Sequence, residues 1–309
     1  MKTRFSLLLC LLVFSLSCNR LTSNEPAPLT EFRTEGNMTV DGRNRYYLLN
    51  LPSNYNEASD ISLVIALHGG GGKATQMESD YLLTEKANKE KFAIVYPEGV
   101  QSEGILGVRT WNAGTCCDYA VEKNIDDVKY ISLLIDDLLK KYPKLNPKKV
   151  YATGMSNGAM LSYRLACELS HKIAAIAPVA GTLATTQPCK PSRAVPILHI
   201  HSKLDEKVPY GGGVGIFGFY FPPVEDGLNT WVKNDGCNAT TKTVTILNKY
   251  TLIKWTNCNN SSTIEFYFTH DGGHSWPGGL HSRAAADEPS TAINANDLIW
   301  AFFQKYQLP

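Results

Sequence analysis

The chain has 309 residues, enough to bury the core of one large α/β domain. Its 30 basic and 29 acidic residues nearly cancel. The sequence therefore has no overall electrostatic field that would favour nucleic acid or an anionic membrane surface, and we expect a neutral or small polar partner.

The first residues, "MKTRFSLLLCLLVFSLSC", combine a basic start with an apolar run that is too short to span a bilayer. This pattern predicts an export signal over residues 1–17. The stretch "FSLSC" resembles a bacterial lipoprotein signal, in which Cys18 becomes the acylated first residue of the mature chain; plain secretion is the alternative. Residues 18–31 are polar and contain prolines, as a tether does. Membrane contact is expected only through this anchor.

Export places the remaining six cysteines in an oxidising compartment, where an even number favours disulfides. Cys237 and Cys258 flank a predicted strand pair, so we expect a local bridge between them. The other four allow three pairings, which the sequence leaves open: Cys116, Cys117, Cys167 and Cys189. The spacing lacks the second C-x-x-C or the histidine pair of a zinc site, and we expect neither metal nor cofactor.

Along the chain, short apolar runs alternate with longer amphipathic ones, which indicates a mostly parallel central sheet with helices on both faces. An Asp-Gly pair within 38–52 predicts an antiparallel hairpin at one edge of the sheet. Residues 125–143 and 291–306 have helical periodicity. We therefore expect one α/β domain over residues 32–309, with buried strands in 62–69, 92–99, 148–156, 173–181, 195–202 and 263–270.

The pentapeptide "GMSNG" at 154–158 follows one of these strands and precedes a predicted helix. A G-x-S-x-G pattern in this setting is typical of the sharp turn that presents the nucleophile of an α/β-hydrolase. An ordinary loop serine between two glycines is the alternative. We predict that Ser156 is a nucleophile, which requires a histidine base and a carboxylate that orients it.

This fold supplies the three groups in the chain order Ser, Asp, His. Asp205 follows the strand in 195–202, and His274 follows the strand in 263–270, where the carboxyl ends of parallel strands place catalytic loops. We predict Asp205 and His274 as the partners of Ser156. The competing carboxylates are Asp118, Asp126, Asp127, Glu206 and Asp271, and the competing histidines are His270 and His281. His199 and His201 alternate on one strand, so they share a face and are expected to pack there or support the site.

The oxyanion of an acyl-transfer intermediate needs two backbone N–H donors. Asn157, the residue after the nucleophile, is predicted to supply one, and Gly70 of "LHGGGG" the other, with Gly71 as the alternative. A phosphate-binding loop is disfavoured because "GGGGKAT" lacks the glycine spacing of a Walker A motif. Phe217, Phe219, Tyr220 and Phe221 lie in a Gly-rich segment and are predicted to line an acyl pocket or to cover core.

Several motifs together resemble the polyhydroxybutyrate depolymerase-type and feruloyl esterase members of the α/β-hydrolase superfamily, related to carbohydrate esterase family 1. They are "LVIALHGGGG", "VYPEG", "WNAGTCCDYA", "GMSNGAMLSYRLACEL", "VPILHIHSKLDEKVPY" and "GGHSWPGG". The resemblance implies a secreted serine esterase with Ser156, Asp205 and His274 as its triad. Trp111 and Trp276 lie within these motifs and are the expected substrate-binding residues.

We therefore predict an exported serine carboxylic ester hydrolase acting on feruloyl or acetyl esters of plant polysaccharide. A poly- or oligo-hydroxyalkanoate depolymerase is the alternative within the same chemistry. Two alternatives of other classes are a surface glycan-binding protein with a vestigial site and a serine peptidase.

Overall fold

The structure is a computed structural model that describes residues 32–105, 107–281 and 286–309. The predicted signal, the tether and Cys18 lie outside these residues. Within the described ranges, no helix is both long and apolar enough to cross a membrane.

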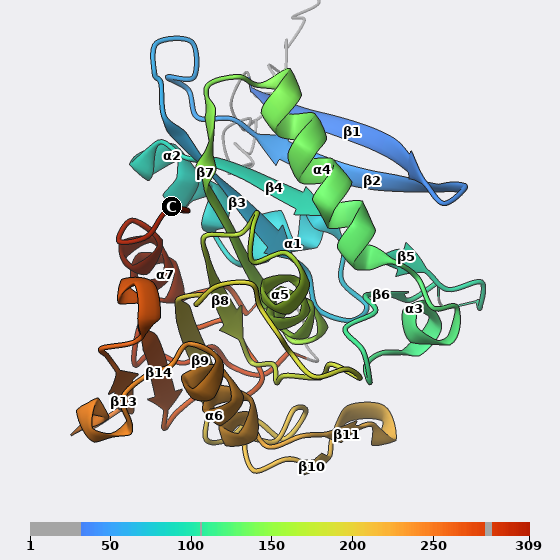
Figure 1. Cartoon of the computed structure of the whole chain (residues 1–309). Coiled ribbons are helices and arrows are strands. Elements are labelled where there is room, and N and C mark those ends of the chain that lie inside the picture. Colours follow the sequence, from blue (N-terminus) through green and yellow to red (C-terminus); the bar gives the residue numbers. More distant parts are fainter. Residues whose placement is uncertain (1–31, 106, 282–285) are drawn as a thin grey trace, which may run out of the picture.

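A ten-stranded sheet forms the centre of the molecule, in the order β1-β2-β4-β3-β7-β8-β9-β14-β13-β12 (Figure 1). The six strands from β4 to β14 in this order are parallel, as the continuous apolar runs predicted. They are β4 (Ala93–Pro97), β3 (Ile61–Leu67), β7 (Leu145–Met155), β8 (Ala175–Val179), β9 (Ile197–Ser202) and β14 (Ile264–Thr269).

An antiparallel hairpin closes each edge of the sheet. At one edge, β1 (Arg33–Val40) and β2 (Arg43–Asn50) are joined by the Asp-Gly turn, which confirms the hairpin predicted there. At the other edge, β12 (Thr243–Ile246) pairs with β13 (Tyr250–Trp255), between Cys237 and Cys258. Those two cysteines form the expected bridge, and the remaining bridges are Cys167–Cys189 and Cys116–Cys117.

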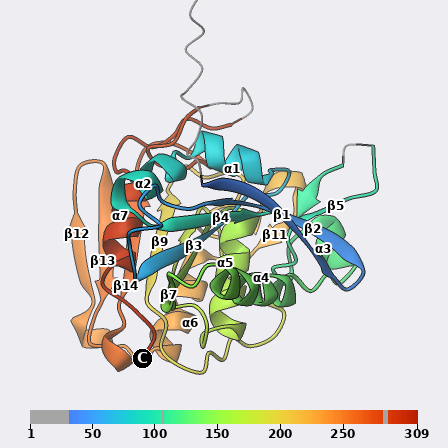
Figure 2. The ribbon, with the colours of Figure 1, turned by 90° about the horizontal axis from the view of Figure 1, so that it is seen from above.

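Helices cover both faces of the sheet, and the alternation of strand residues gives each face its own core. Leu63 and Ile65 of β3 pack on one side with α4 (Asp127–Lys141), α5 (Asn157–Glu168) and α6 (Val224–Asn234). Val64 and Ala66 pack on the other with α1 (Ala74–Asp80), α2 (Leu83–Glu90) and α7 (Ala295–Phe303). Figure 2 shows the two helical layers with the sheet between them.

Short elements surround one end of the sheet. They are β5 (Val100–Gln101), β6 (Arg109–Thr110), α3 (Asp118–Glu122), β10 (Gly213–Val214), η1 (Ile216–Gly218) and β11 (Tyr220–Phe221), while η2 (Ala239–Thr241) and η3 (Asn259–Ser261) flank the β12–β13 hairpin. The parallel strands end at the same edge, so the loops after β3, β7, β9 and β14 meet there.

Candidate active site

Ser156 lies on a sharp turn between β7 and α5, in the setting that the sequence predicted. Its backbone has φ 56° and ψ −120°, a conformation that residues other than glycine rarely adopt. A Cβ added to Gly158 would lie 2.3 Å from the carbonyl oxygen of Leu67, so only glycine lets the start of α5 approach β3 this closely. The Ser156 N–H donates to the Val179 carbonyl at 2.9 Å, which fixes the turn against β8.

Asp205 and His274 come together from the loops after β9 and β14. The Nδ1 of His274 donates to the Asp205 carboxylate at 2.8 Å. The other carboxylate oxygen accepts the backbone N–H groups of Lys207 and Val208 at 3.0 and 2.8 Å. Burial opposes the charge of Asp205, but the neighbouring His274 and these donors outweigh it and hold the pKa of Asp205 below its ordinary value. Asp205 is therefore ionised and fixed in orientation.

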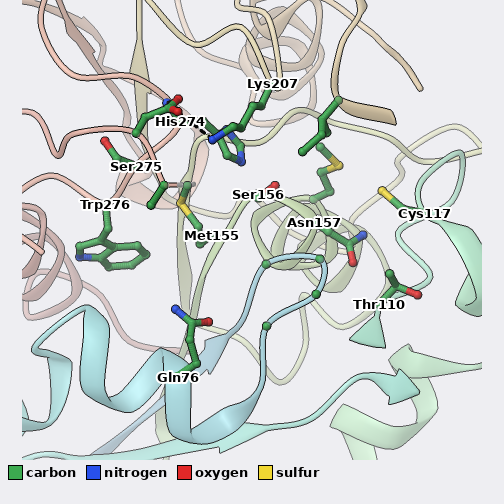
Figure 3. A pocket seen from close by; sticks show the side chains of 18 of the residues that line it. Gln76, Thr110, Cys117, Met155, Ser156, Asn157, Lys207, His274, Ser275 and Trp276 are labelled. Atoms are coloured by element: carbon green, nitrogen blue, oxygen red, sulfur yellow. Dashed lines mark hydrogen bonds and ion pairs between the residues drawn. The ribbon is translucent and has the colours of Figure 1, made fainter. Parts of the chain in front are cut away.

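Ser156 and His274 line the same cavity, with His274 beside the serine in Figure 3. Among the described residues the structure has no hydrogen bond between the Ser156 hydroxyl and the His274 ring. In free serine hydrolases this contact is often long and tightens when substrate binds. The arrangement can thus supply a nucleophile, a base and a carboxylate that orients the base.

The competing side chains lie elsewhere or have other partners. His270 contacts the Thr251 hydroxyl at 3.0 Å, and His281 pairs with Glu288 at 2.7 Å. Asp271 accepts hydrogen bonds from Thr291 at 3.0 and 2.9 Å. The remaining carboxylates contribute differently: Asp126 caps α4, Asp127 is buried against Arg45, Glu206 is exposed, and Asp118 borders the cavity at the start of α3.

The glycine loop after β3, residues 69–72, borders the cavity beside Ser156. The N–H of Gly71 donates to Arg109 at 2.8 Å, and the N–H of Gly72 donates to Gly69 at 2.9 Å, so both amides are used within the protein. A Cβ added to Gly70 would lie 3.9 Å from the Cβ of Asn157, which places these two residues side by side. Asn157 is the first residue of α5, where a helix leaves its N–H groups without intrahelical partners. The geometry favours Gly70 over Gly71 as an oxyanion donor.

His68, directly before the glycine loop, is fully buried and fixes the loop from below. Its Nε2 accepts the N–H of Gly99 at 2.9 Å, and its Nδ1 contacts the Gly69 carbonyl at 2.7 Å. Burial lowers the pKa of His68 to about 4, so the ring is neutral near pH 7. The neutral ring then donates from Nδ1 and accepts at Nε2, which matches both contacts.

Trp111 is not a wall of the cavity, contrary to the expectation from its motif. Its side chain is fully buried, and its indole N–H donates to the His68 carbonyl at 2.8 Å. The side-chain amide of Asn157 forms two hydrogen bonds with the backbone of Trp111. Its oxygen accepts from the Trp111 N–H at 2.7 Å, and its nitrogen donates to the Trp111 C=O at 3.0 Å. Trp111 thus supports the glycine loop and the start of α5.

Trp276 does border the cavity, two residues after His274 (Figure 3). Its indole N–H donates to the Asn296 side chain at 2.9 Å, and its ring stacks on Tyr81 with centroids 5.0 Å apart. These contacts fix the ring, and only 1% of Trp276 is exposed, so the residue supports this wall of the cavity from the core and offers little surface of its own.

Asp287 is a part of the site that the sequence reasoning missed. One of its oxygens accepts the backbone N–H of His274 at 2.6 Å, and the other pairs with Lys207 at 2.7 Å. Burial opposes the charge of Asp287, but Lys207 and the His274 N–H prevail and lower its pKa. Asp287 therefore joins the histidine loop to the loop that follows Asp205. No motif marks it, because the partners are 13 and 80 residues away in sequence.

The cavity has a volume of about 610 Å³. One side is formed by the segment 213–221, here called the aromatic arm, from which Ile216, Phe217, Phe219 and Phe221 border the cavity. The sequence left open whether this segment lines a pocket or covers core, and its residues differ in this respect. Phe221 is buried in the core, whereas Phe217 is 88% exposed and adopts a positive φ of 56°.

Comparisons with known proteins agree with this architecture. The family described as Phospholipase/Carboxylesterase matches residues 56–220, and the chain belongs to that family. Feruloyl esterase B of Piromyces equi is 30% identical over 238 residues, covering 74% of this chain and 42% of the relative. Bifunctional acetylxylan esterase/xylanase XynS20E of Neocallimastix patriciarum is 28% identical over 229 residues, covering 72% of this chain and 30% of the relative. The chain thus spans less than half the length of these two relatives.

Among solved structures, the acetyl xylan esterase from Aspergillus awamori aligns with a TM-score of 0.60 at 16% identity, covering 88% of this chain and 99% of that chain. At this identity the likeness shows the fold, which is the predicted α/β-hydrolase fold.

Proposed function

We propose that the protein is an exported serine carboxylic ester hydrolase that works through an acyl-enzyme. The observation that carries the proposal is the hydrogen bond between Asp205 and His274, together with the position of His274 in the same cavity that Ser156 lines. A carboxylate–imidazole pair beside a serine in this conformation provides the groups that acyl transfer requires.

The reaction follows from the placement of these groups. His274 takes the Ser156 proton at Nε2 as the hydroxyl oxygen attacks the ester carbonyl, and Asp205 stabilises the imidazolium that forms. The N–H groups of Gly70 and Asn157 hold the oxyanion. His274 then gives its proton to the leaving alcohol. A water molecule, deprotonated by the same ring, releases the acid and restores Ser156.

The substrate is proposed to be a feruloyl or acetyl ester of plant polysaccharide, with the feruloyl ester favoured. A cavity of about 610 Å³ bordered by Phe217 and Phe219 is far larger than an acetyl group needs and offers aromatic surface to a flat acyl group. The names of the two relatives, a feruloyl esterase and an acetylxylan esterase, support this substrate class. Hydroxyalkanoate oligomers are the second candidate.

A panel of four substrates tests the proposal: methyl ferulate, acetylated xylan, hydroxybutyrate oligomers and a peptide anilide. Turnover is expected on the first two, and the substitution Ser156→Ala should lower it at least about 10⁴-fold without changing the circular dichroism spectrum. Cleavage of the anilide alone would make the protein a peptidase. Failure of a fluorophosphonate probe to label Ser156 would instead favour a glycan-binding protein with a vestigial site.

Export is supported by the Cys167–Cys189 and Cys237–Cys258 disulfides, because disulfides form in oxidising compartments. We further propose that Cys18 carries the lipid anchor, so that the catalytic domain is held at the cell envelope by residues 18–31. Labelled palmitate should be incorporated into the wild-type protein and not into the variant Cys18→Ala. Absence of label from the wild type would leave plain secretion.

A further inference from the structure

A chain of buried polar side chains lies next to Asp205, and none of its members lines the cavity. The Tyr163 hydroxyl of α5 lies 2.9 Å from His199 Nδ1, and His199 Nε2 lies 3.3 Å from His201 Nδ1. His201 Nε2 lies 2.8 Å from the Val208 carbonyl oxygen and 3.4 Å from Asp205 Oδ2. Tyr163, His199 and His201 are fully buried. Together they connect the helix that carries Ser156 to the catalytic carboxylate.

The proton positions in this chain follow from its last member. A backbone carbonyl can only accept, so His201 carries its proton on Nε2 and donates it to the Val208 carbonyl. Burial lowers the pKa values of both histidines, so each ring is neutral and has one donor and one acceptor nitrogen. His201 Nδ1 therefore accepts from His199 Nε2, and His199 Nδ1 accepts from the Tyr163 hydroxyl. The hydrogen bonds of the chain therefore run in one direction, from the Tyr163 hydroxyl to the Val208 carbonyl.

His201 contacts both ends of the turn that presents the carboxylate. Val208 accepts from His201 through its carbonyl and donates through its N–H to Asp205 Oδ1 at 2.8 Å. The same Asp205 oxygen that lies 3.4 Å from His201 Nε2 accepts the hydrogen bond from His274 Nδ1 at 2.8 Å. A substitution at His201 would therefore alter the position of the Asp205 carboxylate, which orients His274.

Burying such a chain lowers the stability of the fold relative to an apolar core, so we expect the chain to have a role that accounts for it. Burying hydroxyl and imidazole groups costs free energy that hydrogen bonds only offset, and apolar side chains would fill this space without that cost. The surroundings are apolar, since the Phe266 ring lies 5.3 Å from His199 and the Tyr210 ring 6.5 Å from His201, centroid to centroid. Asp205 and His274 are the other ionisable groups that act on His201.

From this geometry we infer that His201 is a positioning residue of the site: its Nε2–H holds the Val208 carbonyl, and with it the 205–208 turn, so that Asp205 keeps the orientation that His274 requires. His199 and Tyr163 fix the tautomer in which His201 donates from Nε2. The inference rests on the proposed ester hydrolysis and adds an indirect support for the catalytic carboxylate, through Val208, to the direct contacts of His274 and the backbone N–H groups.

Two substitutions at one position test the role of the donor. His201→Leu removes the N–H, whereas His201→Gln places an amide N–H near the position of Nε2. With p-nitrophenyl acetate, His201→Leu is expected to lower kcat about tenfold while KM changes less than about twofold, and His201→Gln should recover most of that loss. Phe266→Leu is the matched control, because it disturbs the packing beside His199 without removing a hydrogen bond. It should lower the unfolding temperature and leave kcat near the wild-type value.

The inference is overturned if the Leu and Gln variants lose kcat equally, or if Phe266→Leu loses as much kcat as His201→Leu at a similar unfolding temperature. Should His201→Leu fail to fold, Tyr163→Phe serves in its place, since it removes only the first donor of the chain and should lower kcat about twofold. An unchanged kcat in Tyr163→Phe would then contradict the inference. If the wild-type protein hydrolyses no ester, the proposed function fails, whatever the variants do.

Discussion

Two sides of the cavity are held in different ways. The reaction wall, formed by the glycine loop 69–72 and the turn 154–158, is fixed by hydrogen bonds to backbone groups and by buried His68, Trp111 and Asn157. The aromatic arm, by contrast, reaches the cavity through a short hairpin and leaves Phe217 largely exposed. Acyl transfer needs donors and nucleophile at fixed positions, whereas an apolar subsite can vary in shape. The contrast predicts that the two sides respond differently to substitution.

The largest effect on the reaction wall is expected from Asn157→Ala. The change keeps the backbone N–H proposed for the oxyanion, but leaves the buried N–H of Trp111 without its acceptor and removes one of the two donors to the Trp111 carbonyl, the other being the Cys117 N–H. We expect a loss of about 3 kcal/mol in the free energy of unfolding, together with reduced turnover. Urea denaturation measures the first. Asn234→Ala, which removes one hydrogen bond to Cys189 outside the cavity, is the control and should leave turnover unchanged.

Acid should weaken the same wall through His68. Its folded pKa of about 4 lies below the ordinary value of 6.5, so below pH 6.5 the unfolded chain binds a proton that the folded protein excludes. His68 therefore contributes a loss of about 2 kcal/mol in unfolding free energy between pH 6.5 and pH 5. Urea denaturation at both pH values should show this fall in the wild type and a smaller fall in His68→Asn. Equal falls in both proteins would contradict this role of His68.

Asp287→Asn tests the link between the loops of His274 and Asp205. The amide has the shape of the carboxylate but loses the charge that pairs with Lys207. Because the substitution weakens the placement of His274 without removing a reacting group, we expect kcat to fall about tenfold. Steady-state kinetics with p-nitrophenyl acetate measures it. A variant with wild-type kcat would show that the Asp205 contact alone fixes His274.

The smallest effect is expected on the aromatic arm. Phe217→Ala removes an exposed ring, so the unfolding temperature should stay within about 1 °C of the wild type. If the ring contacts an aromatic acyl group, kcat/KM for methyl ferulate should fall about threefold to tenfold relative to p-nitrophenyl acetate. Tyr220→Ala, on the same hairpin but outside the cavity lining, is the matched control. An equal change in kcat/KM for both esters would show that the aromatic arm is not part of the acyl subsite.

The sequence was informative wherever local chemistry determines structure. Buried parallel strands appear as continuous apolar runs, and the turn at Ser156 requires Gly158 because its backbone passes Leu67 so closely. The order of loops at one edge of the sheet then indicated Asp205 and His274. The alternation of His199 and His201 correctly predicted a shared face, because side chains two apart in a strand point the same way.

The remaining features depend on contacts that no local pattern encodes. The motif around Trp111 suggested a functional position but could not show which way its indole points, and it points into the core. Asp287 reaches His274 only through the folded path of its loop. The Cys116–Cys117 pairing and the division of the aromatic arm between core and cavity likewise depend on tertiary packing.

The two disulfides between distant cysteines make the stability of the fold depend on the redox state of the compartment. Cys167 is at the end of α5 farthest from Ser156, and its bridge to Cys189 spans 22 residues, while Cys237–Cys258 spans 21. Each bridge closes a loop and thereby adds about 3 kcal/mol to the free energy of unfolding, a large fraction of the net stability of a typical domain. In a reducing compartment the chain lacks that contribution and is easier to unfold. Under the export proposed above, the oxidising compartment supplies this stability, so the domain gains its full stability only after it has crossed the membrane.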